Sequence, residues 1–488
     1  MNLAELIRGP VEGAPGRTAL IVNDARLSYE EVGGQVERCA AQLVARGVGP
    51  GDRVPLLDDC SPLLLASLLG AARIGAAAVP IHVELQVEEL RQVMALAGCT
   101  KLGIAGEMYR EKLGEALGRP ALGAVEILAA DPPAAAPPVV DAPDLACVVI
   151  LTSGTTGLPK PIPLSHRSFT PRMAGFARAF RPDKPESVSL MCVPGVHIGG
   201  LGGLLVGLAS GATLVVLQRF RAGDWLAAAG RHRPTTAFLV PTMLRRVLDH
   251  PDFDATDLES LRMLTYGAAA APVALVEEML RRFPQHVAFS NVYGQTETTG
   301  AIAVFGPGDH RLDESGRLYK AGSVGRLVPG VEHRVVEPAT GDDVAPGSVG
   351  ELWVRSRFNA AEGWNRTGDL VRIDAEGYVF PDGRLSDTIN RGGEKFGPAE
   401  IEAVLRRHPA VADVAVAGIP DPEFGERVGA AIVRRGKLDA ETIRAFCREH
   451  LARFKLPERI AFVDELPHTN LWKLSRRQIA ELIERQPS

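Results

Sequence analysis

Short apolar runs separated by amphipathic stretches recur along most of the chain. Four such runs are predicted as strands: Val148–Leu151, Thr213–Leu217, Ala237–Val240 and Arg262–Thr265. The stretches between them place apolar residues at helical spacing, so strands and helices alternate. This alternation predicts an α/β layered fold.

Two N-terminal segments carry clearer boundary signals. Residues 27–50 predict a helix that follows a strand. Ser28 can cap this helix, Glu31 three positions later completes a capping box, and Gly47 can end it. Residues 63–81 predict a buried helix followed by a strand.

The pattern of residue types changes at three further places along the chain. The Pro/Ala-rich segment 131–144 predicts a surface linker. Beyond residue 330, short strands with Gly and Pro turns predict a small β-rich subdomain. Beyond residue 388 the pattern predicts a separate α+β unit, with helices Pro398–Arg407, Ala440–Leu451 and Ser475–Ile483 and strands Val411–Ala417, Gly429–Val433 and Arg459–Phe462.

Length and charge exclude several classes of protein. A chain of 488 residues is too long for one core, because single cores stop growing near ~250–300 residues, so we expect two or three structural units. A net charge of −5 argues against a nucleic-acid partner. Every long apolar run is broken well before the ~18 residues that a membrane span needs, so we expect no membrane partner.

The cysteines and the N-terminus indicate the compartment. The six cysteines lie far apart and form no CxxC pair, which fits reduced thiols in the cytoplasm: Cys39, Cys60, Cys99, Cys147, Cys192 and Cys447. The first residues lack a basic stretch followed by an apolar one, so we expect no signal peptide. The oligomeric state stays open.

A loop rich in hydroxyls follows the strand that ends at Leu151. The run Thr152-Ser153-Gly154-Thr155-Thr156-Gly157-Leu158-Pro159-Lys160 combines glycines, hydroxyls and a lysine. Glycines let backbone N–H groups approach a ligand, and successive N–H groups with a lysine suit a phosphate. The GxxxxGK[ST] spacing of a Walker loop is absent.

Four further motifs follow in the chain: "NVYGQTETTG" at 291–300, "GWNRTGDL" at 363–370, "DGRLSDTINRGGEKFGPAEIEAVL" at 382–405 and "LPHTNLWKLSRRQ" at 466–478. Together with the hydroxyl-rich loop, they resemble the signature motifs of the adenylate-forming superfamily in their usual order. That superfamily includes acyl- and aryl-CoA synthetases, peptide-synthetase adenylation domains and beetle luciferases.

The resemblance implies an α/β fold of two domains. A large multi-layer N-terminal adenylation domain with a β-rich subdomain would span residues 1–383, and a hinge would occupy 384–387. A small mobile α+β lid would span 388–488. In such enzymes a carboxylate attacks the α-phosphate of ATP with Mg²⁺ present and pyrophosphate leaves. The thiol of coenzyme A, or of a carrier pantetheine, then displaces AMP.

The resemblance also implies a nucleotide site. The β- and γ-phosphates would lie on Thr152, Ser153, Gly154, Thr155, Thr156, Gly157 and Lys160. The adenine and α-phosphate would meet the turn Gly267-Ala268-Ala269, the stacking Tyr293 with Gly294, and Thr296. Glu297 would hold Mg²⁺ as an oxygen ligand. Asp369 would accept the ribose hydroxyls, and Arg384 would contact ribose or phosphate.

Other implied roles concern the two half-reactions. Lys473 would bind the carboxylate and the α-phosphate together, and Asp387 would be the pivot of the lid. Gly392 and Gly393 would admit pantetheine, and His197 would border the acid pocket and the thiol tunnel.

Three positions depart from the motifs, and they bear on the substrate. Pro161 replaces a glycine after the loop lysine, Ala268 adds a methyl to a Gly-Gly-Ala turn, and Trp472 replaces the glycine before Lys473. Glycine there would keep the loop permissive, whereas tryptophan adds a large flat surface. The hinge loop resembles those of aryl-acid-activating and small-dicarboxylate-activating members, and of these we expect a small, aromatic acid. Its pocket is expected to include His197, Phe238, Val240, Tyr266, Ala268, Val292 and Ala301.

Three interpretations of function remain at this point. The first is an acid–thiol ligase that makes an acyl- or aryl-CoA. The second is an adenylating enzyme that passes the acyl group to a carrier protein in trans or to a nitrogen nucleophile. The third is a nucleotide-binding regulatory protein with an impaired lid, which Trp472 alone supports.

Overall fold

The computed structural model describes residues 1–23, 25–129, 131, 133, 135–153, 159–179, 187–392, 394–467 and 476–485. The chain divides into two compact units. The N unit comprises Met1–Ala321, Gly325–Val331 and Arg355–Asn365. The C unit comprises Gly322–Val324, Glu332–Val354 and Arg366–Ser488. The four-stranded β-rich part thus groups mainly with the C-terminal segment, and the expected hinge at 384–387 stays a prediction.

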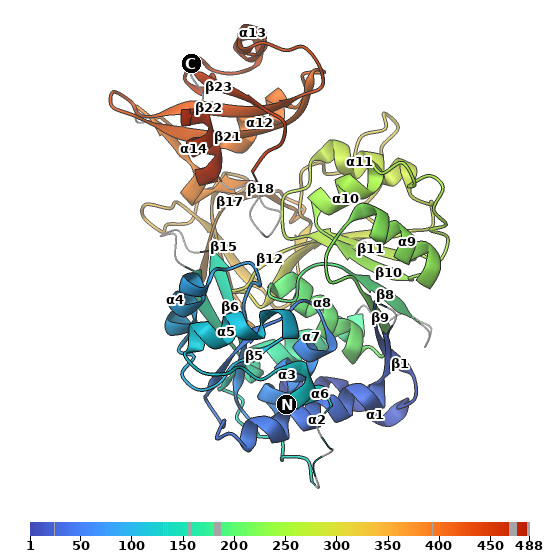
Figure 1. The fold of residues 1–488 in the computed structure, drawn as a ribbon. Helices are drawn as coiled ribbons and strands as arrows, with labels where there is room; N and C mark the ends of the chain where they lie inside the picture. Colours follow the sequence, from blue (N-terminus) through green and yellow to red (C-terminus); the bar gives the residue numbers. More distant parts are fainter. Residues whose placement is uncertain are drawn as a thin grey trace. The chain divides into compact units, whose positions relative to one another are not determined.

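The larger sheet of the N unit, several of whose strands are labelled in Figure 1, carries the expected adenine turn and most of the expected acid-pocket residues. Among the described residues it has nine strands, in the order β14 (Arg326–Leu327), β13 (Gly300–Phe305), β12 (Ala288–Gln295), β11 (Met263–Gly267), β10 (Thr236–Leu239), β8 (Val188–Met191), β9 (Thr213–Val216), β1 (Thr18–Val22) and β2 (Ala25–Ser28). Neighbouring strands from β12 to β1 run parallel, and antiparallel strands close both edges.

A second sheet of the N unit delivers the hydroxyl-rich loop. Its order is β5 (Ile104–Ala105), β3 (Arg53–Leu57), β4 (Ala77–Pro80), β6 (Ala146–Ser153) and β7 (Pro159–Ser165). The pairs are parallel except β6 with β7, which form an antiparallel hairpin. In parallel sheets, ligands bind beyond the carboxyl ends of the strands, and β6 ends at this loop.

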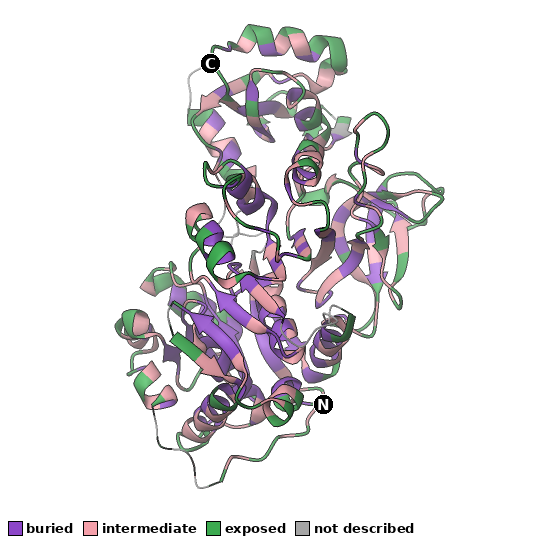
Figure 2. Ribbon diagram, turned by 90° about the vertical axis from the view of Figure 1, so that its right-hand side faces the viewer, coloured by how far each residue is buried: buried purple, intermediate pink, exposed green. Residues whose placement is uncertain are grey.

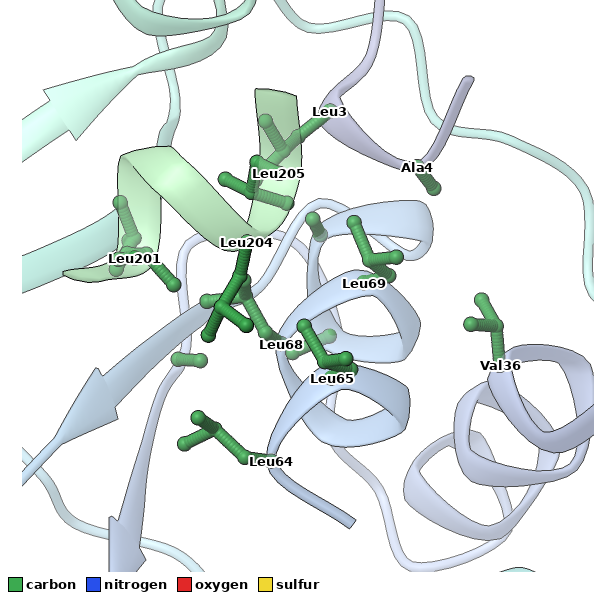
Figure 3. Close-up of a cluster of buried hydrophobic side chains, with 14 of the residues drawn as sticks. Leu3, Ala4, Val36, Leu64, Leu65, Leu68, Leu69, Leu201, Leu204 and Leu205 are labelled. Atoms are coloured by element: carbon green, nitrogen blue, oxygen red, sulfur yellow. The ribbon is translucent and has the colours of Figure 1, made fainter. Parts of the chain in front are cut away.

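Helices cover these sheets and supply the core. In chain order they are η1 (Leu3–Ile7), α1 (Arg8–Gly13), α2 (Tyr29–Val44), α3 (Pro62–Arg73), α4 (Val87–Ala97), η2 (Glu107–Tyr109), α5 (Arg110–Leu117), α6 (Ala124–Leu128), α7 (His166–Ala179), α8 (Ile198–Ala209), α9 (Ala222–His232), α10 (Pro241–Leu248) and α11 (Val273–Arg282). Leucines of α3 and α8 meet with Leu3 of η1 in the largest cluster (Figure 3). The strands are largely buried, whereas the helices keep exposed outer faces (Figure 2).

The C unit contains two sheets of its own. The first has the order β15 (Glu332–Val336), β16 (Gly350–Arg355), β17 (Asn365–Ile373) and β18 (Val379–Arg384). The second has the order β20 (Glu394–Phe396), β19 (Ile389–Arg391), β22 (Gly425–Arg434) and β21 (Val411–Asp421), with β23 (Arg459–Val463) on β22. Its helices are η3 (Leu385–Asp387), α12 (Pro398–Leu405), α13 (Ala440–His450), η4 (Arg453–Lys455) and α14 (Arg476–Arg485).

The expected fold class is confirmed, with a mixed α/β N unit and a smaller α+β C unit. The capping box at Ser28 and Glu31 forms as expected, with the Glu31 N–H donating to the Ser28 hydroxyl at 3.2 Å. No helix within the described ranges is long and apolar enough to cross a bilayer.

Candidate active site

The parallel strands β11 and β12 bring the turn that begins at Gly267, which is expected to contact adenine, close to Tyr293, which is expected to stack on it. The register of β11 and β12 pairs Gly267 with Val292, one residue before Tyr293. A Cβ on Gly267 would lie 2.3 Å from the Val292 carbonyl oxygen, so no larger residue fits there. The backbone after Gly267 therefore runs directly beside Val292 and Tyr293.

Ala268 adopts an unusual backbone conformation. Its φ is 68°, in the left-handed region where a Cβ is unfavourable. Its neighbour Ala269 does not share this positive φ. The methyl of Ala268 is exposed at the carboxyl end of β11. A glycine at this position would carry no such strain, so the methyl is tolerated at a cost to the fold.

The motif after Tyr293 forms a tight, buried turn between β12 and β13. Gly294 lies so close to the strand opposite that an added Cβ would be 2.1 Å from the Gly300 carbonyl oxygen. The Thr298 hydroxyl accepts the Gln295 N–H at 3.0 Å and donates to the Gly300 carbonyl at 2.8 Å. Thr299 has φ 55°, which is strained for a β-branched residue and typical of functional turns.

This turn presents two of the expected catalytic side chains. Thr296 is 8% exposed, and Glu297 is half-buried. The Ala360 N–H donates to the Glu297 carbonyl at 2.8 Å, and the Thr299 hydroxyl donates to the Phe358 carbonyl at 2.7 Å. The segment Arg355–Asn365 thus holds the turn from one side.

The hairpin of β6 and β7 brings the two ends of the phosphate loop together. Thr152 pairs with Lys160 across the hairpin, and the Thr152 hydroxyl donates to the Lys160 carbonyl at 3.3 Å. Lys160 is exposed. Residues Gly154, Thr155, Thr156 and Gly157, and the side chain of Ser153, lie outside the described residues.

The expected acid-pocket residues come from neighbouring elements of the N unit. His197 caps α8, and a Cβ on Gly199 would lie 3.4 Å from the Phe238 ring. Val240 is buried at the end of β10. Val292 and Ala301 are half-buried on β12 and β13.

Tyr266 is the most enclosed of the expected pocket residues. Its side chain is 2% exposed, and its hydroxyl is 3.0 Å from Nε2 of His310. Burial raises the pKa of Tyr266 and lowers the pKa of His310 to about 4. The Tyr266 hydroxyl is therefore engaged by His310. Only the Tyr266 ring could contact a bound acid.

Sequence patterns missed a cluster at the carboxyl ends of β3 and β4. His82 follows β4, and its ring centroid is 6.3 Å from that of His197. Asp58 follows β3 and is 7% exposed, with the Ser61 hydroxyl donating to its carboxylate. Burial raises the pKa of Asp58 to about 7, Asp59 adds to the rise, and the Ser61 hydrogen bond opposes it. In the sequence, Asp58 and His82 could have been recognised from their positions just after strands, where site residues are often found.

The two residues expected to contact the ribose lie within the C unit. β17 and β18 are antiparallel, and their register sets Asp369 opposite Arg384. The Arg384 Nε is 2.8 Å from an Asp369 carboxylate oxygen, and Asp369 is 6% exposed. The Thr367 hydroxyl accepts the Asp369 N–H at 3.1 Å, which fixes the backbone at this site. Two residues that the motifs named separately are thus direct neighbours.

The expected pivot Asp387 lies in η3 of the C unit. Arg476, which sequence patterns did not single out, has its Nε 3.8 Å from an Asp387 oxygen. The same guanidinium donates to the buried Glu402 and to the Val416 carbonyl. Gly392 has φ 60°. Gly393, Trp472 and Lys473 lie outside the described residues.

The residues present suit a magnesium ion carried mainly by phosphates. Within the described ranges no three His, Cys, Asp or Glu side chains gather as a ligand set. Mg²⁺ commonly takes one or two protein carboxylates and completes its shell with phosphates and water. Glu297 is a half-buried carboxylate at a rigid turn and can serve as that protein ligand.

Comparisons with known proteins match the whole chain. The family profile described as "AMP-binding enzyme" covers residues 8–364, and its C-terminal domain profile covers residues 400–473. An indoleacetate–CoA ligase of Aromatoleum aromaticum is 35% identical over 100% of this chain and 99% of its own length. A feruloyl-CoA synthase of an Amycolatopsis species is 34% identical over 96% of each chain. A fatty acid–acyl-carrier-protein ligase of Streptomyces coeruleorubidus is 32% identical over 96% and 93%.

Solved structures of similar fold extend these matches. An o-succinylbenzoate–CoA synthetase of Bacillus subtilis, in complex with ATP and a magnesium ion, has a TM-score of 0.84 and 27% identity over 97% of this chain and 99% of that chain. An amide bond synthetase of Marinactinospora thermotolerans has a TM-score of 0.86 and 28% identity over 98% and 99%.

Proposed function

Because the chain belongs to the AMP-binding enzyme family, we propose that it joins a small, aromatic carboxylic acid to coenzyme A through an acyl-adenylate. The acid carboxylate attacks the α-phosphate of ATP, and pyrophosphate leaves. The thiol then attacks the acyl carbon, and AMP leaves with the electrons of the broken acyl–phosphate bond. The enzyme is thus an AMP-forming acid–thiol ligase.

The first half-reaction brings two anions together, so positioned donors and cations must offset their repulsion. Lys160 and the Thr152 hydroxyl hold the outer phosphates, and Thr296 donates to the α-phosphate. Tyr293 and the Gly267-Ala268-Ala269 backbone hold the adenine, and the Asp369–Arg384 pair holds the ribose. Mg²⁺ on Glu297 supplies charge neutralisation at the phosphates when it is bound.

The observation that carries this proposal is the strained turn from Gly294 to Gly300. Backbone strain of this kind costs about 1–3 kcal/mol and persists where function requires a fixed geometry. Here the turn is held by the Glu297–Ala360 and Thr299–Phe358 hydrogen bonds. It presents a hydroxyl and a carboxylate together beside Tyr293, which supports a site for a metal–nucleotide complex.

The aromatic character of the acid is supported by the indoleacetate and ferulate named for two relatives. The pocket proposed here includes the Phe238 ring near Gly199, which suits a flat apolar group. We place the enzyme in the cytoplasm, where ATP and coenzyme A are available and where its six free cysteines stay reduced.

The direct test is ATP–pyrophosphate exchange with a panel of aryl, short aliphatic and long-chain acids. We expect exchange that depends on Mg²⁺ and is fastest with an aryl acid. Absence of exchange with every acid of the panel would refute adenylation. Fastest exchange with a long-chain acid would refute the substrate class and leave the reaction standing.

The final acceptor has a second candidate, a carrier protein or a nitrogen nucleophile. This candidate is supported by two similar proteins, a carrier-protein ligase and an amide bond synthetase. Isolated acyl-adenylate on the enzyme is mixed separately with coenzyme A, a phosphopantetheinylated carrier protein and a simple amine. We expect the fastest AMP release with coenzyme A, and faster release with either other acceptor would replace that assignment.

A further inference from the structure

Arg172 is a buried cation that, within the described part of the chain, has no anionic partner. It lies on α7, the helix that follows the phosphate-loop hairpin, and its side chain is 6% exposed. Among the described residues no carboxylate acts on its charge, and its Nε has no hydrogen-bond partner. Burial alone lowers the pKa of Arg172 to about 10, so the guanidinium stays charged at neutral pH. A charge buried in this way costs several kcal/mol.

The guanidinium instead contacts one carbonyl and two aromatic rings. Its Nη2 donates to the Ala301 carbonyl, the first residue beyond the catalytic turn. It lies 4.6 Å from the ring centroid of Phe176, one helical turn along α7, and 5.1 Å from that of Phe358. Such cation–π contacts contribute about 0.5–2 kcal/mol each when desolvated.

These contacts involve both the strand β13 that follows the turn and the segment Arg355–Asn365 that holds it. Phe358, which the guanidinium stacks on, has the carbonyl that accepts the Thr299 hydroxyl. Ala301 directly follows Gly300, the residue whose added Cβ would lie 3.8 Å from Phe176. Arg172 therefore contacts the strand beyond the turn and the segment that braces the turn, which also donates to the Glu297 carbonyl through Ala360.

We propose that Arg172 is a positioning residue for the metal-binding turn, holding Ala301 and Phe358 so that Thr296 and Glu297 keep their places. The guanidinium donates to the Ala301 carbonyl while its central carbon lies over the rings of Phe176 and Phe358. Lysine can donate to the carbonyl but has no planar group to lie over the two rings. The inference rests on the proposed adenylation reaction, in which Glu297 holds the magnesium of the nucleotide.

The variants Arg172→Met and Arg172→Lys test the proposal. Displacing a catalytic group by about 1 Å can cost roughly a hundredfold in rate. We therefore expect Arg172→Met to lower kcat of pyrophosphate exchange roughly tenfold or more and to raise the Mg²⁺ concentration for half-maximal rate, while KM for the acid stays within about twofold. Arg172→Lys should recover part of kcat because it keeps the donor and the charge.

A second readout does not depend on activity. The thermal midpoint is measured with ATP and Mg²⁺ and then with ATP and a chelator. We expect Mg²⁺ to raise the thermal midpoint more in the wild type than in Arg172→Met, and this rise is the Mg²⁺-dependent increment. Phe358→Leu removes one of the two ring contacts without changing charge, and it should reduce the same Mg²⁺-dependent increment by less.

Arg311→Met is the matched control. Arg311 also stacks on a ring, 3.7 Å from the Tyr319 centroid, and donates to the Gly308 carbonyl, but it is exposed. It should leave kcat and the Mg²⁺ increment unchanged. A rise in KM for the acid with normal Mg²⁺ dependence would make Arg172 an acid-binding charge and overturn the proposal. Unchanged Mg²⁺ dependence and increment in Arg172→Met would also overturn it, whereas a wild type without exchange would overturn adenylation itself.

Discussion

Replacing Ala268 by glycine should stabilise the N unit. The left-handed φ of 68° costs an alanine roughly 1–2 kcal/mol relative to an ordinary conformation. Glycine carries no such cost, but its greater freedom in the unfolded chain offsets about 0.4–1 kcal/mol of the gain. The expected net gain is about 0.5–1 kcal/mol. Since 1 kcal/mol shifts the midpoint of a 150–250-residue domain by ~2–4 °C, the larger N unit should gain roughly 1–2 °C.

The assay is differential scanning calorimetry of the full chain, in which the N-unit transition is followed. Ala269→Gly provides the matched control, because Ala269 lacks the positive φ. There glycine should destabilise by about 0.4–1 kcal/mol, because it increases the freedom of the unfolded chain. Opposite signs at adjacent alanines would support the reasoning, and a midpoint that falls equally in both variants would refute the strained conformation of Ala268.

The same substitution should widen acid selectivity. The exposed methyl of Ala268 occupies the carboxyl end of β11, beside the proposed pocket. One methylene group is equivalent to about 0.8 kcal/mol, or roughly fourfold in rate. We therefore expect kcat/KM for a bulky acid relative to a small one to rise about fourfold in Ala268→Gly. An unchanged ratio would show that this methyl does not face the acid.

Four further outcomes are expected. The folded pKa of about 7 at Asp58 lies above its ordinary value, so the folded state binds more protons and stability falls as pH rises from about 4 to 7; Asp58→Asn should flatten that slope in thermal unfolding. Lys473→Ala should abolish adenylate formation in the exchange assay but leave transfer of supplied adenylate to thiol largely intact. Asp387→Pro should retain exchange and lose thioester formation, because proline fixes φ near −65°. Trp472→Gly should change acid or acceptor selectivity by roughly tenfold, measured as kcat/KM for two acids and two acceptors; ratios within about twofold would make Trp472 an ordinary lid residue.

Local patterns along the chain were enough to predict a number of its elements. The alternation of apolar runs predicted β6, β9, β10 and β11, and the structure confirms each within a few residues. A strand needs only its own apolar run and turn residues nearby, and a helix needs only its periodicity and caps. The helices of the C unit were predicted on the same basis and are confirmed at Pro398–Leu405 and Ala440–His450.

The motif residues were also visible in the sequence, because their chemistry is local. A run of glycines and hydroxyls after a strand suits phosphate wherever that strand lies. The structure adds why two of these positions are constrained: Gly267 lies against Val292, and Gly294 lies against Gly300. Their roles toward ligands stay predictions.

Contacts between distant segments were decided only by the tertiary structure. Arg172 and Ala301 are 129 positions apart, and nothing in either local sequence indicates that a buried guanidinium would meet that carbonyl. The pairing of His82 with His197 likewise depends on two elements brought together by folding. Sequence periodicity reports which face of an element is apolar. It carries no information on which polar side chain is enclosed beneath a given turn, because that depends on the packing of all the elements around it.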